Sequence, residues 1–327
     1  MENWLKPKLQ IEGQIVGTFP SELRDAIRQI VAGQGGFAAQ SEYMSQHYRK
    51  GGSSDATLDL GAYLVTRLPA TYAAVAACLA TLPPHFAPQS ILDAGSGPGT
   101  ASWAAVEAYP AISSVILLDN NAKFLGLAKN LARQSSHVAL TNAAAVPGDF
   151  KSPPENLKAD LVVAAYALAE LPVTAAINAA TALWKACNDT LIIIEPGTPH
   201  GFARINEARS ALIAAGANVL APCTHVNSCP VASPDWCHFK VRLARNREHL
   251  HAKKAKVPYE DEKYSYLIVS RNPVHSAQAR ILAPPVETKS ATTFKLCSEV
   301  GLTKQSVARR DQAEYKRVRK LGWGDVL

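Results

Sequence analysis

The chain has 327 residues, 47% of them hydrophobic, which is enough for one large domain with additions or for two smaller domains. No apolar run approaches the ~18 residues of a membrane span, so we expect no membrane-spanning segment. The net charge of +7 is uneven: residues 240–327 hold 19 Lys and Arg against 9 Asp and Glu, whereas the first 239 residues are slightly acidic. A basic segment on a nearly neutral body favours a polyanionic partner, most often nucleic acid.

Residues 1–70 are predicted to form an N-terminal helical region. A helical stretch at 22–32 ends in a glycine-rich break. Apolar periodicity resumes at 58–67 and 72–82, with Pro69 between them, where a helix can restart.

The N-terminal sequence has neither the charged-then-apolar pattern of a secretory signal nor the Arg- and Ser-rich composition of a mitochondrial leader. We therefore expect a bacterial cytoplasmic protein, or a processed chain of the mitochondrial matrix if the protein is eukaryotic. The free protein is expected to be a monomer.

Residues 71–219 alternate short apolar runs with Ala-rich stretches of helical length. The predicted strands are 89–93, 114–118, 137–140, 160–165 and 190–195. The main helices predicted between and after them are 122–134 and 173–187. This alternation is typical of βαβ units, which form a parallel sheet covered by helices. The fold class is therefore α/β, with a Rossmann-like core.

The first predicted strand ends in a glycine-rich turn, Asp93-Ala-Gly95-Ser-Gly97-Pro-Gly99, and an Ala-rich helix follows it. Glycine accepts backbone angles that a Cβ forbids and lets a ligand approach the main chain, while the helix start offers free N–H groups. The turn lacks the Gly-x-Gly-x-x-Gly register of dinucleotide-binding folds and resembles motif I of class I methyltransferases that use S-adenosylmethionine (SAM). We predict a SAM pocket here; a nicotinamide site and a turn without a ligand are the alternatives.

Three further residues are predicted to complete this pocket. Asp119 ends the second strand, 24 residues after Gly95, where an acid can bind ribose hydroxyls. Asp149 precedes Phe150, so a carboxylate and an aromatic ring stand together as a contact to adenine would need. Ala164 lies in the fourth strand, which enters a loop over the ligand.

Residues 220–263 depart from the strand–helix rhythm and carry Cys223, Cys229 and Cys237, while Cys297 follows after a gap of 59 residues. Such a loop-rich insertion cannot bury a core of its own, and clustered thiolates bind soft metals. The gaps are wider than the Cys-x-x-Cys knuckles of zinc ribbons, whereas iron–sulfur clusters accept loop-borne spacing with a distant fourth cysteine. Spacing alone leaves iron–sulfur and zinc open.

The remaining candidate ligands are given other roles. Cys78 and Cys187 lie in Ala-rich helical segments and are predicted to be small core residues. His225 and His238 stand beside the cysteines and are alternative ligands, but for each of them a position at the surface or beside the metal's ligands is favoured.

Residues 264–327 are expected to supply the last strands of the same sheet, at 264–270 and 294–296, together with Cys297. A basic tail then covers 304–320. The organisation is thus a helical region at 1–70, a SAM-binding core at 71–219, a cysteine-rich insertion at 220–263 and a C-terminal part at 264–327.

Several motifs occur together in one order: 93–101 (Asp-Ala-Gly-Ser-Gly-Pro-Gly-Thr-Ala), 195–199 (Glu-Pro-Gly-Thr-Pro), 221–223 (Ala-Pro-Cys), 229–230 (Cys-Pro), 235–239 (Asp-Trp-Cys-His-Phe), 259–266 (Tyr-Glu-Asp-Glu-Lys-Tyr-Ser-Tyr) and 323–325 (Trp-Gly-Asp). Over about residues 40–327 the chain resembles the Rsm-type methyltransferase-like proteins of the small ribosomal subunit, which are mitochondrial assembly factors and their bacterial relatives.

The resemblance implies a [4Fe–4S] cluster held by four cysteines, which map onto Cys223, Cys229, Cys237 and Cys297, and it favours that cluster over zinc. It also implies a SAM pocket at Gly95, Gly97, Gly99 and Asp119. The implied partner is the small ribosomal subunit with its ribosomal RNA (rRNA), and the implied role is in subunit assembly.

No catalytic residue can be assigned from the sequence. Enzymes that methylate exocyclic amines of bases commonly carry an Asn/Asp-Pro-Pro-aromatic loop after the fourth strand, where this chain has Ala-Ala-Tyr166-Ala. A cysteine nucleophile for cytosine C5 is also missing at that place. Three hypotheses remain: an assembly factor with a SAM pocket, an active rRNA methyltransferase that works by positioning, and a small-molecule methyltransferase with structural zinc.

Overall fold

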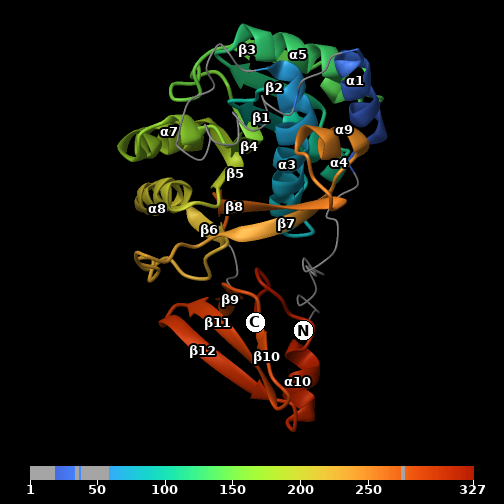
Figure 1. Cartoon of the computed structure of the whole chain (residues 1–327). Helices are drawn as coiled ribbons and strands as arrows, with labels where there is room; N and C mark the ends of the chain where they lie inside the picture. The colour runs from blue at the N-terminus through green and yellow to red at the C-terminus, as the bar shows by residue number, and fades with distance from the viewer. Residues whose placement is uncertain (1–18, 34–36, 38–58, 274–276) are drawn as a thin grey trace.

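The computed structural model describes residues 19–33, 37, 59–273 and 277–327, so much of the expected N-terminal helical region lies outside the described residues. The described chain forms two sheets, one of eight strands and one of four. Figure 1 shows the four-stranded sheet below the larger one, with the loop that follows β6 between them.

The larger sheet has the strand order of the class I methyltransferase fold. Its path is β3-β2-β1-β4-β5-β8-β6, with β7 also paired to β8. The strands are β1 (Ser90–Ala94), β2 (Ser114–Asp119), β3 (Ala144–Pro147), β4 (Ala159–Ala165), β5 (Cys187–Pro196), β6 (Asn218–Ala221), β7 (Phe239–Ala244) and β8 (Tyr259–Ser270). The first five are parallel, whereas β8 runs antiparallel to β5, β6 and β7. The predicted α/β class and Rossmann-like core are confirmed.

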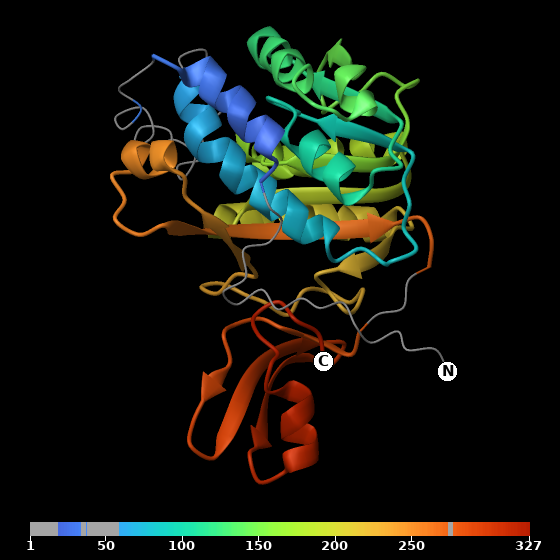
Figure 2. The same ribbon diagram turned by 90° about the vertical axis from the view of Figure 1, so that its right-hand side faces the viewer.

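Helices cover both faces of this sheet, as Figure 2 shows from the side. On one face lie α1 (Ser21–Val31), α3 (Leu60–Leu79), α4 (Thr100–Ala108), α5 (Ala122–Ala132) and α6 (Val138–Thr141); on the other lie α7 (Val173–Ala186) and α8 (Pro199–Ala214). Successive strand residues serve the two cores in turn: Ile91 packs in the first and Leu92 in the second. This alternation explains why the central strands are apolar throughout.

The helix α3 is one element where two were expected. It runs through Pro69 without a break, and the Asp59 carboxylate caps its start by accepting a hydrogen bond from the Ala62 N–H. Burial of most of its length against the sheet outweighs the ~3 kcal/mol cost of an internal proline. By length and composition α3 is long enough to cross a membrane, but 78% of its most apolar 18-residue stretch is buried in the protein, as in a core helix.

The expected strand at 137–140 is wrong. Residues Val138–Thr141 form the short helix α6, whose Ala139 and Leu140 are buried in the first core. The third strand is instead β3, a short edge strand of small residues with little burial. The apolar signal therefore came from a helical turn, because the true strand has no large buried side chain.

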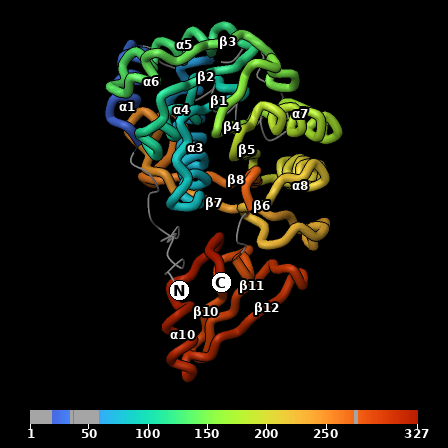
Figure 3. The backbone as a smooth tube through the Cα atoms, turned by 180° about the vertical axis from the view of Figure 1, so that it is seen from behind, coloured from blue at the N-terminus to red at the C-terminus, as the bar shows by residue number. Residues whose placement is uncertain are grey.

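The C-terminal strand at 294–296 was expected in the main sheet, and this is also wrong. It belongs to β11 (Ala291–Ser298), which pairs with β9 (Ala279–Ile281), β10 (Val286–Glu287) and β12 (Gly301–Ala308) in the second sheet. The expected basic tail at 304–320 contains the later part of β12 and the helix α10 (Gln312–Val318). The helix packs on a small separate core around Phe294. Figure 3 shows this second unit from behind.

Candidate functional site

The glycine turn connects β1 to α4 in the way that its sequence predicts. Gly95, Gly97 and Gly99 have φ of 68°, 51° and 80°, a region that side chains with a Cβ rarely adopt. The N–H groups of Gly95 and Ser96 both donate to the carbonyl oxygen of Leu118, at 2.8 and 3.1 Å, which ties the turn to the end of β2. A Cβ on Gly95 would lie 2.8 Å from the Cβ of Ala167, so the loop after β4 passes directly over the turn.

A pocket of about 630 Å³, open solvent included, lies above this turn at the carboxyl ends of the parallel strands. We call it the nucleoside pocket; its lining is Tyr63, Arg67, Thr71, Gly95, Gly97, Asp119, Asn120, Phe124, Phe150, Ala165, Tyr166, Ala167 and Glu170. Ligands of open α/β sheets bind at this edge. Three of the residues named for SAM binding, Gly95, Gly97 and Asp119, are therefore brought together.

The other four named residues lie close by but outside this lining. Gly99 caps the start of α4, and Ala164 is fully buried in the sheet, where its neighbour Ala165 reaches the pocket. Asp149 pairs with Lys151 at 3.0 Å, and it is Phe150 that lines the pocket.

Asp93 supports the turn from beneath. Its buried carboxylate accepts hydrogen bonds from the Ser102 N–H and hydroxyl, both at 3.0 Å. Burial raises the pKa of Asp93 to about 7, although these two bonds act in the opposite direction.

Asp119 is one of two acidic residues in the lining of the nucleoside pocket, with Glu170. Its carboxylate accepts the Gly97 N–H at 2.7 Å and the Asn121 N–H at 2.8 Å. Burial raises the pKa of Asp119, and these two hydrogen bonds partly offset that rise. The acid is therefore fixed against the glycine turn at the end of β2.

One wall of the nucleoside pocket contains a network that the sequence did not reveal. Tyr166 has a positive φ of 61°, which is unusual for a residue with a Cβ, and its hydroxyl donates to Glu262 Oε1 at 2.8 Å. The Arg67 guanidinium pairs with the same Glu262 oxygen at 3.3 Å and lies 5.2 Å from the centre of the Tyr166 ring. Burial and the Glu262 carboxylate hold the pKa of Tyr166 well above its usual value.

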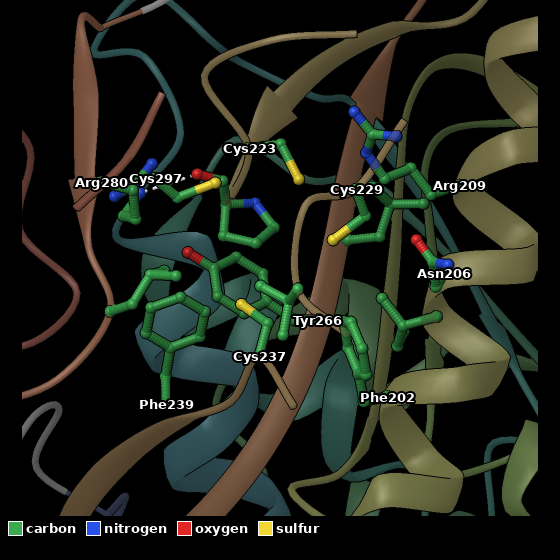
Figure 4. Close-up of a pocket in the computed structure, with 15 residues that line it drawn as sticks. Phe202, Asn206, Arg209, Cys223, Cys229, Cys237, Phe239, Tyr266, Arg280 and Cys297 are labelled. Carbon is green, nitrogen blue, oxygen red and sulfur yellow. Dashed lines mark hydrogen bonds between the residues drawn. The ribbon is translucent and has the colours of Figure 1, made fainter. Parts of the chain in front are cut away.

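The four cysteines assigned to a metal face one cavity between the two sheets. Figure 4 shows the sulfur atoms of Cys223, Cys229, Cys237 and Cys297 directed toward a common space. The cavity measures about 520 Å³, open solvent included, and apolar side chains of α8 and β8 form much of its remaining wall. We call it the thiol cavity. Cys297 reaches it from β11 of the second sheet, and the other three come from the loop between β6 and β7.

Each of the six pairs formed by these four thiols interacts electrostatically. Burial is the main cause that raises the pKa of Cys223, of Cys237 and of Cys297, the last to about 11, and the neighbouring thiols add to it. Among the described residues, however, no three Cys, His, Asp or Glu side chains are close enough to hold a single metal ion. The thiols thus surround a cavity without meeting at one point.

Two buried arginines line the thiol cavity, and the described lining contains no carboxylate. Arg209 donates to the carbonyl oxygens of His225 and Asn227 at 2.7 and 2.9 Å, and Arg280 donates to those of Pro222 and Gly324 at 2.8 and 2.7 Å. Both arginines favour the thiolate form of Cys223. The cavity is therefore suited to an anionic occupant.

The two candidate histidines lie near the thiols in different ways. His225 Nε2 is 3.6 Å from Cys297 Sγ, whereas His238 stacks on Trp236 with ring centres 5.1 Å apart.

A family model described as "Mitochondrial small ribosomal subunit Rsm22" matches residues 57–327. The chain belongs to the Rsm22 family. The match covers both sites and both sheets, and it confirms the resemblance drawn from the motifs.

Curated relatives of this Rsm22-family chain include the human "Ribosome assembly protein METTL17, mitochondrial", which is 28% identical over 293 residues. That alignment covers 81% of this chain and 61% of the human protein. The fission yeast (Schizosaccharomyces pombe) "Rsm22-cox11 tandem protein 2, mitochondrial" is 22% identical over 295 residues, which is 73% of this chain and 38% of the yeast protein. The chain thus spans less than two thirds of the length of these relatives, both named as mitochondrial proteins.

Solved structures similar to this Rsm22-family chain include methyltransferases. The magnesium protoporphyrin IX methyltransferase of Synechocystis PCC 6803 with bound SAM has a TM-score of 0.43 and 14% identity, covering 78% of this chain and 100% of that one. The precorrin-6y C5,15-methyltransferase of Geobacter metallireducens has a TM-score of 0.39 and 15% identity, covering 67% and 93%. The assignment of the main sheet to the class I methyltransferase fold depends on its strand order and not on these similarities.

Proposed function

We propose that this Rsm22-family chain is a methyltransferase-like assembly factor of the small ribosomal subunit. It binds SAM in the nucleoside pocket, holds a [4Fe–4S] cluster in the thiol cavity and contacts rRNA through its basic C-terminal part. The observation that carries the proposal is the presence in one chain of an intact glycine-turn pocket and of four cysteines around a cavity where the two sheets meet. The names of the relatives favour the mitochondrial matrix and give the cytoplasmic alternative no support.

The nucleoside pocket fits SAM by the chemistry of its lining. The backbone at Gly95 and Gly97 is accessible at the turn, and the Asp119 carboxylate stands at the end of β2, where it can accept hydrogen bonds from ribose hydroxyls. Phe150 supplies an aromatic face for adenine. Gly99, Asp93, Asp149 and Ala164 act from outside the lining, through the shape of the turn and the adjoining strand.

The thiol cavity fits an iron–sulfur cluster by its donor set. Four cysteines on wide, loop-borne spacing are the ligands that such clusters use, and a multi-atom cluster suits thiols that surround a space. The buried Arg209 and Arg280 would offset the negative charge of four thiolates. When bound, the cluster would fix the β6–β7 loop to β11, so that the second sheet is held in place on the core. Zinc remains the alternative occupant.

Methyl transfer is the second candidate activity, and the retained nucleoside pocket favours it. In the wall of that pocket the Tyr166 hydroxyl donates to Glu262, and Glu262 is itself paired with Arg67, so we assign neither side chain as the acceptor of a substrate proton. In this second proposal the enzyme would act by positioning its substrate.

The proposal is tested by two measurements on the full chain. Binding to protein-free small-subunit rRNA should weaken steeply between about 50 and 200 mM salt, as expected when several phosphates are neutralised. A flat salt response would contradict the assignment of the basic part to rRNA. With tritiated SAM and immature small subunits, we expect SAM to bind without transfer of label; transfer would replace the assembly-only function with an rRNA methyltransferase.

A further inference from the structure

Three aromatic rings from distant parts of the chain meet beside the thiol cavity. Trp236 and His238 stack with ring centres 5.1 Å apart and planes 20° apart. Trp323, near the C-terminus, stands edge-on to His238 at 4.9 Å and 85°. All three side chains are only partly buried, so together they form a half-open aromatic corner.

Lysines from three strands surround this corner. The Lys240 ammonium of β7 lies 5.9 Å from the centre of the Trp323 ring. Lys263 of β8 stands directly opposite Lys240 in the strand register, and Lys295 of β11 pairs with Asp235, the residue before Trp236. Two acids stand among these lysines: Asp235 is paired with Lys295, and Asp261 lies 3.9 Å from the Lys240 ammonium. Asp261 is also held by two nitrogens of Arg242, so the cations still outnumber the acids. The corner therefore combines aromatic faces with an excess of positive charge.

The positive charge continues along the uncovered face of the second sheet. Lys295 stands directly opposite Lys304 on β12, next to the pair Thr293 and Ser306, whose hydroxyls are 2.7 Å apart. Like charges opposite each other on neighbouring strands are destabilising. Asp235 offsets part of that repulsion through its pair with Lys295, and an anion bound across this face would offset more of it.

The corner is also joined to the edge of the main sheet that carries the nucleoside pocket. The Trp236 indole N–H donates to the Gly197 carbonyl at 3.0 Å, just after β5 ends. Lys263 follows Glu262 of the pocket wall on β8. Cys237, between Trp236 and His238, faces the thiol cavity. One short segment thus connects both sites to the corner.

We propose that Trp236, His238 and Trp323 form a stacking site for an unpaired RNA base, and that Lys240, Lys263 and Lys295 bind the phosphates on either side of it. We call this the base-stacking site. It rests on the proposed binding of rRNA and adds where an unpaired stretch of that RNA is held. Aromatic side chains within a cationic surface are the means by which proteins bind single strands with little sequence preference. A base within a duplex is already stacked on both faces, so the site selects single-stranded segments.

The test compares full-length variants for binding to a single-stranded RNA of about 12 nucleotides and to the same sequence in a duplex. Trp323→Ala should weaken single-strand binding about 5- to 150-fold, the range for loss of one stacked base, whereas Trp323→Phe should bind nearly as the wild type. Phenylalanine keeps an aromatic ring at this position. The change removes no hydrogen bond, because the Trp323 indole N–H has no partner among the described residues.

A second variant removes one charge and keeps all three rings. Lys240→Gln should weaken single-strand binding and lower the slope of log K against log salt by about 0.7, the value for one phosphate contact to a single strand. Lys123→Gln, on the exposed surface of α5 at the other end of the sheet, is the matched control. It should leave the single-strand affinity and the salt slope unchanged.

The outcomes separate the base-stacking site from the proposed function. If the wild type binds rRNA but Trp323→Ala and Lys240→Gln bind like it, the base-stacking site is refuted and the proposed function stands. If the wild type binds neither rRNA nor the single strand, the proposed function fails, and the site fails with it. If Trp323→Ala keeps RNA binding but no longer joins the small subunit, the surface recognises a protein, and the RNA assignment is overturned.

Discussion

The nucleoside pocket and the thiol cavity are built in opposite ways. The pocket lies on consecutive strand–turn–helix units whose backbone is held by the parallel sheet, for example through the bonds from Gly95 to Leu118. The cavity is lined by the loop after β6 and by Cys297 of another sheet, and the hydrogen bonds of Arg209 and Arg280 to loop carbonyls support it. The pocket should therefore keep its shape without a ligand, whereas the cavity should depend on what its thiols bind.

Loss of one thiol should give the largest effect and should divide the two regions. Cys237→Ser in the iron-loaded protein is expected to abolish the visible absorption of a cluster and to destabilise the second sheet by more than about 4 kcal/mol, because metal binding and folding are coupled. SAM affinity, measured by calorimetry on the same sample, should change little. The visible absorption measures the cluster, and the rate of proteolysis of the C-terminal part measures the stability of the second sheet.

Cys187→Ala is the matched control for this prediction. Its thiol is also buried, but it lies in the second core at the end of α7, away from the thiol cavity. Cys187→Ala should keep the visible absorption of the cluster, and the protein should lose only the small free energy of unfolding that a new cavity in the core costs. An unchanged spectrum in Cys237→Ser would remove this residue from the ligand set.

A substitution in the glycine turn should have the opposite effect, because it should weaken SAM binding and leave the thiol cavity unchanged. Gly95→Ala places a Cβ 2.8 Å from Ala167 in a left-handed backbone, so it should cost about 1–2 kcal/mol of stability and weaken SAM binding at least ~10-fold. The absorption from the thiol cavity should persist. Gly126→Ala within α5 has open space and is the control; it should be stabilising by up to ~1 kcal/mol. Equal SAM affinity for Gly95→Ala and the wild type would place the ligand elsewhere.

The same contrast decides how much the sequence could predict. The glycine turn and Asp119 were predictable because their determinants are local: a strand, small residues and an acid at the next strand end. The pairing of Arg67 with Glu262 was not, because it joins α3 to β8 across 195 residues and neither side chain has a local signature. The positive φ of Tyr166 is likewise set by the fold around it.

The second sheet was hidden for a different reason. Residues 302–306 of β12 are all exposed, so the strand lacks the alternation of buried and exposed residues that marks a half-buried strand, and its lysine suggested a tail. The cysteines were found because thiols are rare and clustered. Their meeting with Arg209 and Arg280 could not be predicted, since an arginine in a sequence gives no sign that it will be buried.

The smallest expected effect concerns Glu195, the last residue but one of β5, beside the loop over the nucleoside pocket. Neither carboxylate oxygen has a hydrogen bond among the described residues, although the N–H groups of Leu168 and Ala169 and the Arg204 guanidinium are near enough to favour its charge. Burial outweighs them and raises the pKa of Glu195 from 4.5 to about 8. Between these values the folded state binds a proton that the unfolded state has lost, so its contribution to stability is full below pH 4.5 and is lost as the pH rises through 8.

Glu195→Gln should therefore stabilise the protein by about 1 kcal/mol at pH 8.5 and by almost nothing at pH 4.5, as measured by urea unfolding at both values. Glu207→Gln, on the exposed side of α8, should show no such difference. A gain of equal size at both pH values would show that Glu195 does not titrate in this range. Because Glu195 belongs to the main sheet, its pH effect should persist in Cys237→Ser. Its loss there would mean that the thiol cavity supports the nucleoside pocket, and that the two regions are less independent than their construction indicates.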